Sequence, residues 1–118
     1  MLKKGDQVSI HANRWMDSFG NTLHVVRVAV LRKGDDYYTD VGESEISYGY
    51  GAEWARDMGY EQTARAMLGE AFAFPRGWGP AERRDGRGSR PLWQLRDFGV
   101  ELISAARDVK RKYELGYI

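Results

Sequence analysis

The fold that we expect depends on one stretch near the N-terminus, which reads Thr22-Leu23-His24-Val25-Val26-Arg27-Val28-Ala29-Val30-Leu31-Arg32. In a strand, side chains point alternately to the two faces of the sheet. Both faces are mostly apolar here, with Val26, Val28 and Val30 on one and Leu23, Val25, Ala29 and Leu31 beside Arg27 on the other. A strand that is apolar on both faces is usually central and covered twice. We therefore expect this stretch to form the middle of a sheet.

Shorter strand patterns flank this central strand. Before it, apolar and polar residues alternate from Gln7 to Asn13, and a hairpin loop follows. After it, the stretches Tyr37–Val41 and Ile46–Tyr48 favour strand and are separated by turns. The pattern predicts an antiparallel β-meander of three or four strands over about residues 6–48.

Helical patterns follow the meander. Apolar residues spaced by four predict one or two helices over about residues 52–73, with Gly59 as a weak point. Near the C-terminus the same kind of spacing predicts a long amphipathic helix over about residues 92–114. Its apolar stripe consists of Leu95, Phe98, Leu102, Ala106, Val109 and Tyr113. We therefore expect an α+β fold in a single domain over residues 1–118, with two or three helices, the last one long.

The composition narrows the possible classes of protein. The 118 residues suit one domain, and 13% aromatic residues argue against a disordered chain. A net charge of +1 argues against a DNA mimic and a wholly basic coat protein. The absence of cysteine excludes disulfides, iron–sulfur clusters, thiolate zinc sites and cysteine nucleophiles. The sequence has no apolar run of membrane-spanning length and no signal peptide at its start, so we expect a cytoplasmic protein without a cofactor.

The charges are distributed unevenly along the chain. The net charge is +4 over residues 1–34, −7 over residues 35–62 and +4 over residues 63–118. Such a chain can attract a second copy of itself or two different partners. The predicted last helix either packs on its own sheet or forms a dimer seam. We expect a homodimer, because the central strand needs two covers, of which the helices supply one and a second subunit the other.

The segment 75–91 carries the main candidate contact residues. It contains all three prolines, four glycines, five arginines and a tryptophan, and loops of this length are usually functional or disordered. Arginine binds phosphates through paired N–H groups, tryptophan stacks on bases, and both are favoured at protein interfaces. A solvated connector between helices is the alternative interpretation. The candidate contacts are Arg76, Trp78, Arg83, Arg84, Arg87 and Arg90.

Two further segments are candidate contact sites. The tip of the first hairpin is polar and aromatic, so it is either a recognition surface or a small core folded back on the sheet. Its candidate contacts are Arg14, Trp15 and Asn21. Alternating tyrosine and glycine at residues 48–51 mark a strand-to-helix junction where a ligand could approach a helix N-terminus, although close packing explains them equally well. The candidate ligand contacts there are Tyr48, Tyr50 and Gly51.

The two histidines are weak evidence for a metal site, and the sequence lacks the common catalytic motifs. If the first hairpin pairs residues whose numbers sum to 35, His11 faces His24, and the pair could hold a metal with a nearby carboxylate. A surface pair or a buried, hydrogen-bonded histidine is the more ordinary interpretation. The sequence contains no nucleophile elbow, no Walker loop and no H-E-x-x-H motif. We therefore expect a protein that is not an enzyme and holds no metal.

A family resemblance extends over residues 14–68. The chain contains Gly20-Asn21-Thr22-Leu23-His24, then Tyr48-Gly49-Tyr50-Gly51, then Gln62-Thr63-Ala64. This order of segments resembles small uncharacterised phage and prophage proteins, although the spacer Ala52 to Gly59 is longer here. The resemblance carries no functional residue over. It implies a small accessory protein of the kind that blocks host machinery, including CRISPR effectors and nucleotide-signalling defences.

The sequence therefore predicts a non-enzymatic, phage-type accessory protein. In the leading hypothesis it is anti-CRISPR-like: it binds a host defence complex, either a protein complex or a nucleoprotein, and inhibits that complex by occupying its surface. In the second hypothesis it binds nucleic acid through the arginine-rich segment 75–91. In the third it sequesters a nucleotide signal. No membrane partner is expected.

Overall fold

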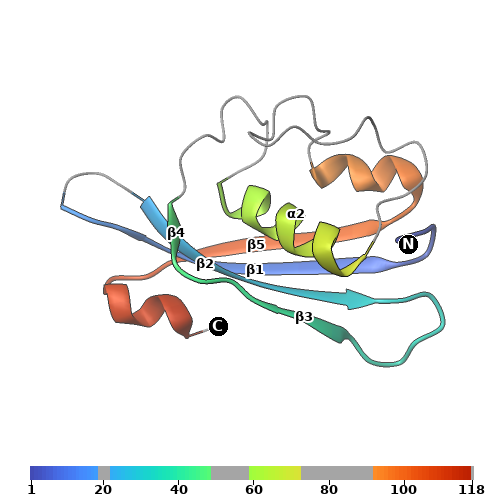
Figure 1. The fold of residues 1–118 in the computed structure, drawn as a ribbon, viewed down its shortest axis with the longest axis horizontal. Helices are drawn as coiled ribbons and strands as arrows, with labels where there is room; N and C mark the ends of the chain where they lie inside the picture. Colours follow the sequence, from blue (N-terminus) through green and yellow to red (C-terminus); the bar gives the residue numbers. More distant parts are fainter. Residues whose placement is uncertain (19–21, 49–58, 73–91, 118) are drawn as a thin grey trace.

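The computed structural model describes residues 1–18, 22–48, 59–72 and 92–117, which form one mixed β-sheet with helical segments on both faces (Figure 1). The strand order is β3-β2-β1-β5, and the short β4 also pairs with β2. The strands are β1 (Gln7–Met16), β2 (Thr22–Leu31), β3 (Thr39–Glu43), β4 (Ser47–Tyr48) and β5 (Glu101–Asp108). The helical segments are the α-helix α2 (Gly59–Ala71) and the 3₁₀ helices η1 (Leu92–Phe98) and η2 (Lys112–Gly116). β2 is an interior strand, as its apolar pattern predicts.

The prediction of a purely antiparallel meander is wrong. β1 pairs antiparallel with β2, but it pairs in parallel with β5 from the C-terminal part of the chain. Parallel neighbours need a long connection that returns the chain to the same end of the sheet. Here α2 and η1 lie within that connection, and both pack on the same face of the sheet.

The predicted long helix over residues 92–114 is also wrong. Gly99 has a positive φ of 79° and follows η1, and a Cβ at this position would lie 2.7 Å from the side chain of Lys4. After this turn the chain is extended in β5, where Leu102 is buried while Ile103 is exposed. Leu102 and Ala106 are four residues apart, and this spacing places two side chains on one face of a helix or of a strand alike. The sequence pattern therefore did not distinguish the two structures.

The described part of the other predicted helix is present. α2 coincides with residues 59–71 of the predicted segment 52–73, and residues 52–58 and 73 lie outside the described residues. Gly59 is the first residue of α2. Within the described ranges, no helix is long and apolar enough to cross a membrane.

The main core lies between one face of the sheet and the segments α2 and η1. Val8 and Ile10 of β1 pack there with Val26, Val28 and Val30 of β2, and all five side chains are fully buried. Above them lie the fully buried side chains Ala64, Leu68, Leu92 and Leu95. We call this the covered face of the sheet. Its residues alternate along each strand with those of the opposite face.

The opposite face carries a second, smaller core at one end. Leu115 of η2 packs against Leu23 and Val25 of β2, and Trp15 and Val109 lie beside them. Asn13 fixes η2 in place, because its Nδ2 donates to the carbonyl oxygens of Glu114, Leu115 and Tyr117 at 3.0–3.2 Å. Figure 1 shows η2 on the other side of the sheet from α2.

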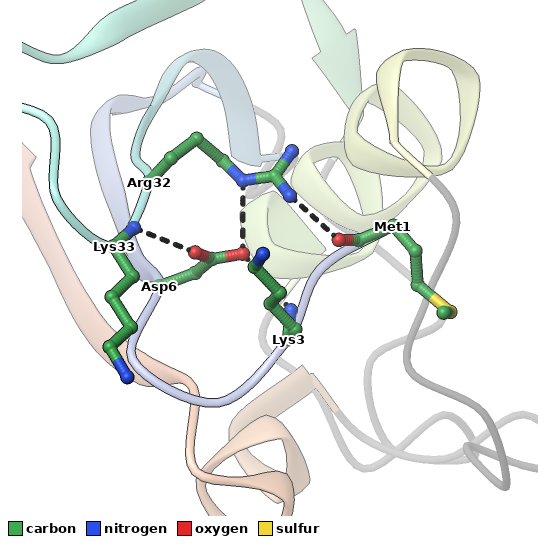
Figure 2. Close-up of polar contacts among 5 residues, drawn as sticks. All are labelled: Met1, Lys3, Asp6, Arg32 and Lys33. Atoms are coloured by element: carbon green, nitrogen blue, oxygen red, sulfur yellow. Dashed lines mark hydrogen bonds and ion pairs between the residues drawn. The ribbon is translucent and has the colours of Figure 1, made fainter.

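A buried carboxylate joins the N-terminus to the loop that follows β2 (Figure 2). Asp6 is fully buried and accepts hydrogen bonds from the backbone N–H groups of Lys3 and Lys33 at 3.0 and 2.9 Å. Arg32 Nε lies 3.1 Å from Asp6 Oδ2, and Arg32 Nη2 donates to the carbonyl oxygen of Met1. Burial alone would raise the pKa of Asp6, but the two backbone hydrogen bonds and the charge of Arg32 together hold it below its ordinary value.

Candidate functional site

The candidate site lies on the face of the sheet opposite α2, beyond the end that η2 covers. We call this area the open face. Its central residues are Ser9 and His11 of β1, Arg27 and Ala29 of β2, and Ile103, Ala105 and Arg107 of β5. Within the described ranges, nothing packs over this area as α2 and η1 do over the covered face. Ile103 is 40% exposed and therefore adds accessible apolar surface to this face.

The pairing register brings these residues together. His11 lies opposite Arg27 in the antiparallel pair and beside Ala105 in the parallel pair. The numbers of paired residues in β1 and β2 sum to 38, so the predicted pairing of His11 with His24 is wrong. The observed register places Val26, Val28 and Val30 of β2 beside Ala12, Ile10 and Val8 on the covered face, and the gain in apolar burial explains why it is preferred.

Two shallow hollows occupy the open face. One has a volume of about 480 Å³ and lies toward η2, with Arg27, Ala105, Arg107 and Tyr117 in its lining. The other has a volume of about 460 Å³ and lies between Ala29, Ile103 and Tyr38. His11 and Arg27 line both hollows, so the two hollows are adjacent. Each hollow also has a tyrosine in its lining, Tyr117 in the first and Tyr38 in the second.

The polar groups of the open face are held by neighbours but remain accessible. Arg27 Nη2 lies 3.1 Å from Asp40 Oδ2, and the two side chains are 49% and 55% exposed. Arg107 Nη2 donates to the carbonyl oxygen of Tyr117 at 2.9 Å. His11 Nε2 lies 3.1 Å from Ser9 Oγ. Two guanidinium groups, an imidazole and apolar side chains can together bind an anionic or polar surface, but no nucleophile here is paired with a base and a carboxylate.

The hairpin end of the sheet forms a third hollow, of about 470 Å³, which includes the predicted contacts Arg14 and Trp15 in its lining. Arg14 Nε is 3.1 Å from Asp108 Oδ1, and its guanidinium lies 5.8 Å from the ring centre of Tyr60. Trp15 packs against the small core under η2. The interpretation as a small core folded back on the sheet fits Trp15. Arg14 is a partly exposed cation and stays a candidate contact.

A buried polar group lies under the start of α2. His24 is 1% exposed, and its Nε2 lies 2.7 Å from Thr63 Oγ1. Burial lowers the pKa of His24 and therefore favours the neutral ring. Ser104 Oγ donates to Glu61 Oε1 at 3.1 Å and lies 3.2 Å from Tyr60 Oη. These hydrogen bonds satisfy buried polar atoms between α2 and the sheet, which is a structural role.

Burial also raises the pKa of the Tyr60 phenol. The hydrogen bond with Ser104 and the charge of Arg14 oppose this increase, whereas Glu61 adds to it. Tyr60 thus stays protonated at neutral pH and is available as a hydrogen-bond donor within this group.

Most of the contacts predicted from the sequence lie outside the described residues. These are Asn21, Tyr50, Gly51, Arg76, Trp78, Arg83, Arg84, Arg87 and Arg90. The backbone of Tyr48 belongs to β4, opposite Leu23, and its side chain is not described. The structure brings Arg14 and Trp15 together at one hollow. His11 and His24 lie on opposite faces of the sheet, and among the described residues no three potential metal-ligating side chains gather.

Sequence reasoning missed the open face itself. Its signal was present in β2, where Arg27 interrupts an otherwise apolar side, and in β1, where Ser9 and His11 alternate with buried residues. The contribution of Ile103 and Arg107 was hidden by the helix predicted for their segment. No family model, curated protein or solved structure matches this chain. The choice of the open face as the candidate site is therefore based on its geometry alone.

Proposed function

We propose that this chain is a non-enzymatic binding protein of phage type, which inhibits a host defence complex by occupying its surface through the open face. The observation that carries the proposal is a sheet face that presents accessible apolar side chains between arginines and tyrosines. Arginine and tyrosine are enriched where protein interfaces hold most of their binding energy. The phage context comes from the resemblance over residues 14–68.

The shape of the open face supports a large partner rather than a small substrate. Its two hollows are adjacent and shallow, and Tyr38 and Tyr117, which line one hollow each, are 45% and 65% exposed. A small ligand is usually bound in a pocket that encloses most of its surface. A shallow, accessible area in which arginines and tyrosines lie beside apolar side chains instead matches the composition of protein interfaces.

Nucleic acid is the second candidate, and a specific observation favours it. Arg27, Arg107 and His11 line one hollow, where phosphates could bind, and Tyr117 is placed to stack on a base. This alternative predicts binding that weakens steeply with salt, with the slope reduced by about 1 for each phosphate-binding arginine that is removed. A protein partner predicts a much weaker dependence on salt.

The proposed function is tested in bacteria that carry a defence system active against a phage. Expression of the wild-type chain should restore plating of the phage. The chain should also retain the defence complex during purification after nuclease treatment. The variant His11→Ala/Arg27→Ala should lose both effects, with a decrease in affinity of about tenfold or more. Lys3→Ala is the matched control, because it removes an exposed cation that lines neither hollow.

Two results would contradict the proposal. Failure to restore plating against a broad panel of defence systems would contradict inhibition. Full inhibition by a correctly folded His11→Ala/Arg27→Ala variant would show that the open face is not the contact surface. Retention that disappears with nuclease would favour the nucleic-acid alternative.

A further inference from the structure

The outer edge of β5 is a second surface with unused binding capacity. β5 is the last strand of the sheet, and in the part of the chain that the structure describes no strand pairs with its outer side. The backbone N–H of Glu101 donates to the carbonyl oxygen of Asp6 at 2.9 Å, which places the inward-facing backbone groups on the odd-numbered residues. The N–H and C=O groups of Leu102, Ser104 and Ala106 therefore point away from the sheet.

Among the described residues, this edge has none of three common protections against another strand. Proteins commonly block exposed edges with proline, bulges or inward-pointing charges. The pairing of β5 with β1 is unbroken from Glu101 to Asp108, and the strand contains no proline. Arg96 Nη2 reaches the edge and donates to the carbonyl oxygen of Leu102 at 3.0 Å, but a carbonyl can accept a second hydrogen bond. The edge is thus a template for strand addition.

The sequence of β5 is complementary to itself in one antiparallel register. If Ser104 lies opposite Ser104 of the partner subunit, Glu101 lies opposite Arg107 of the partner subunit, and the same pair recurs at the other end. Ile103 then lies opposite Ala105 of the partner subunit, between the two charged pairs. The charged and apolar members of these pairs, Glu101, Ile103, Ala105 and Arg107, lie on the open face, whereas the Ser104 side chain points toward α2. Opposite charges or apolar groups across strands stabilise a pair.

Neighbouring registers lose this complementarity. A shift must be by two residues, because a shift by one would exchange the two faces of the strand. A shift in either direction places Glu101 opposite Ala105 or Val109, and Arg107 opposite Gly99 or Ile103. The charged groups are also accessible, because both residues are exposed and no described side chain pairs with the Glu101 carboxylate. Arg107 uses one N–H on Tyr117 and keeps the others.

We propose that two copies of this chain form a homodimer by antiparallel pairing of their β5 strands, with Ser104 at the two-fold axis. The two sheets become one continuous sheet, and the two open faces lie side by side on the same surface. Charge complementarity at both ends of the strand selects a second copy rather than an unrelated peptide. This inference does not depend on the proposed function, because it concerns an edge and not the occupant of the open face.

The dimer is tested by sedimentation equilibrium of the full chain over a wide concentration range. The wild type should dimerise reversibly. Glu101→Arg and Arg107→Glu each replace two attractive pairs by two repulsive ones. The dimer affinity of each variant should therefore fall by about tenfold or more. The charge-swap variant Glu101→Arg/Arg107→Glu restores both pairs and should recover most of the wild-type affinity. Glu70→Arg, on the exposed side of α2, is the matched control and should have no effect.

A backbone block provides an independent measurement. Ala106→Pro removes an outward-pointing N–H without removing a hydrogen bond to β1, so the variant should fold and remain monomeric. A wild type that is monomeric at its highest soluble concentration would overturn the proposal. A dimer that tolerates Ala106→Pro would also overturn the proposal and would point to another surface. Failure of the charge-swap variant to recover the dimer would overturn the proposed register of β5 against β5.

Discussion

The two faces of the sheet are built by the same strands and differ in what lies over them. On the covered face, Ile10 and Val28 are fully buried beneath α2 and η1. On the open face, His11 directly follows Ile10 in the chain, Arg27 directly precedes Val28, and both side chains are exposed. Alternation along a strand thus assigns stability to one face and leaves the other available for binding. The comparison predicts that the same kind of substitution has different consequences on the two faces.

The largest effect is expected for isoleucine on the covered face. Ile10→Ala removes a fully buried side chain from the main core and should lower the free energy of unfolding by about 4 kcal/mol. Ile103→Ala is the matched substitution on the open face, where the side chain is already 40% exposed, and should cost less than about 1 kcal/mol. Urea denaturation of both variants measures the difference. Equal losses would show that the open face is part of a core.

A slightly smaller loss is expected for the buried carboxylate at the N-terminal end. Asp6→Asn removes the charge that pairs with Arg32 and should lower the free energy of unfolding by about 3 kcal/mol at neutral pH. The pKa of Asp6 is lower in the folded protein than in the unfolded chain, so its contribution is complete above about pH 5 and is lost as the pH falls through the folded value. The difference between wild type and variant should therefore narrow in acid. A constant difference would contradict the ionic role of Asp6.

The histidines extend the comparison to pH. Burial lowers the pKa of His24 in the folded state, so the unfolded chain binds its proton first. Stability should then be complete above about pH 6.5 and fall below it, by up to about 1.4 kcal/mol per pH unit from this residue. His24→Gln should remove that slope between pH 6.5 and 5. His11→Gln, on the open face, is the matched control and should retain it.

The smallest effect on stability is expected for the arginine at the centre of the open face. Arg27→Ala breaks an ion pair in which both side chains are about half exposed, so it should change the free energy of unfolding by less than about 1 kcal/mol. Thermal denaturation measures this change directly. A loss of several kcal/mol would mean that Arg27 is needed for folding.

Part of this fold could be predicted from the sequence, for identifiable physical reasons. Apolar and polar residues alternate in Gln7–Asn13 with a period of two that no helix shares, and this stretch lies in β1. The next stretch is apolar on both faces and rich in β-branched valine, which favours a central strand, and it forms β2. The segment containing Leu102 and Ala106 has a spacing of four, which fits helix and strand alike. Its structure is decided by pairing with β1, which lies some ninety residues earlier in the chain.

The candidate site was less predictable than the fold, because it combines residues from distant strands. Arg27 and Arg107 line one hollow because β1 lies between β2 and β5 and brings their strands together. The local sequence around either arginine does not contain that arrangement. The register error had the same origin. Local apolar matching allowed His11 to face His24, whereas burial of Val26, Val28 and Val30 beside Val8 and Ile10 puts His11 on the same face as Arg27, its observed partner.

The central claim is that the open face binds a partner while the covered face maintains the fold. It is tested most directly by measuring inhibition and the free energy of unfolding on the same His11→Ala/Arg27→Ala protein. We predict an unfolding free energy within about 1 kcal/mol of the wild type and a loss of inhibition of about tenfold or more. Wild-type inhibition by this variant, or a loss of inhibition that occurs only together with unfolding, would contradict the claim.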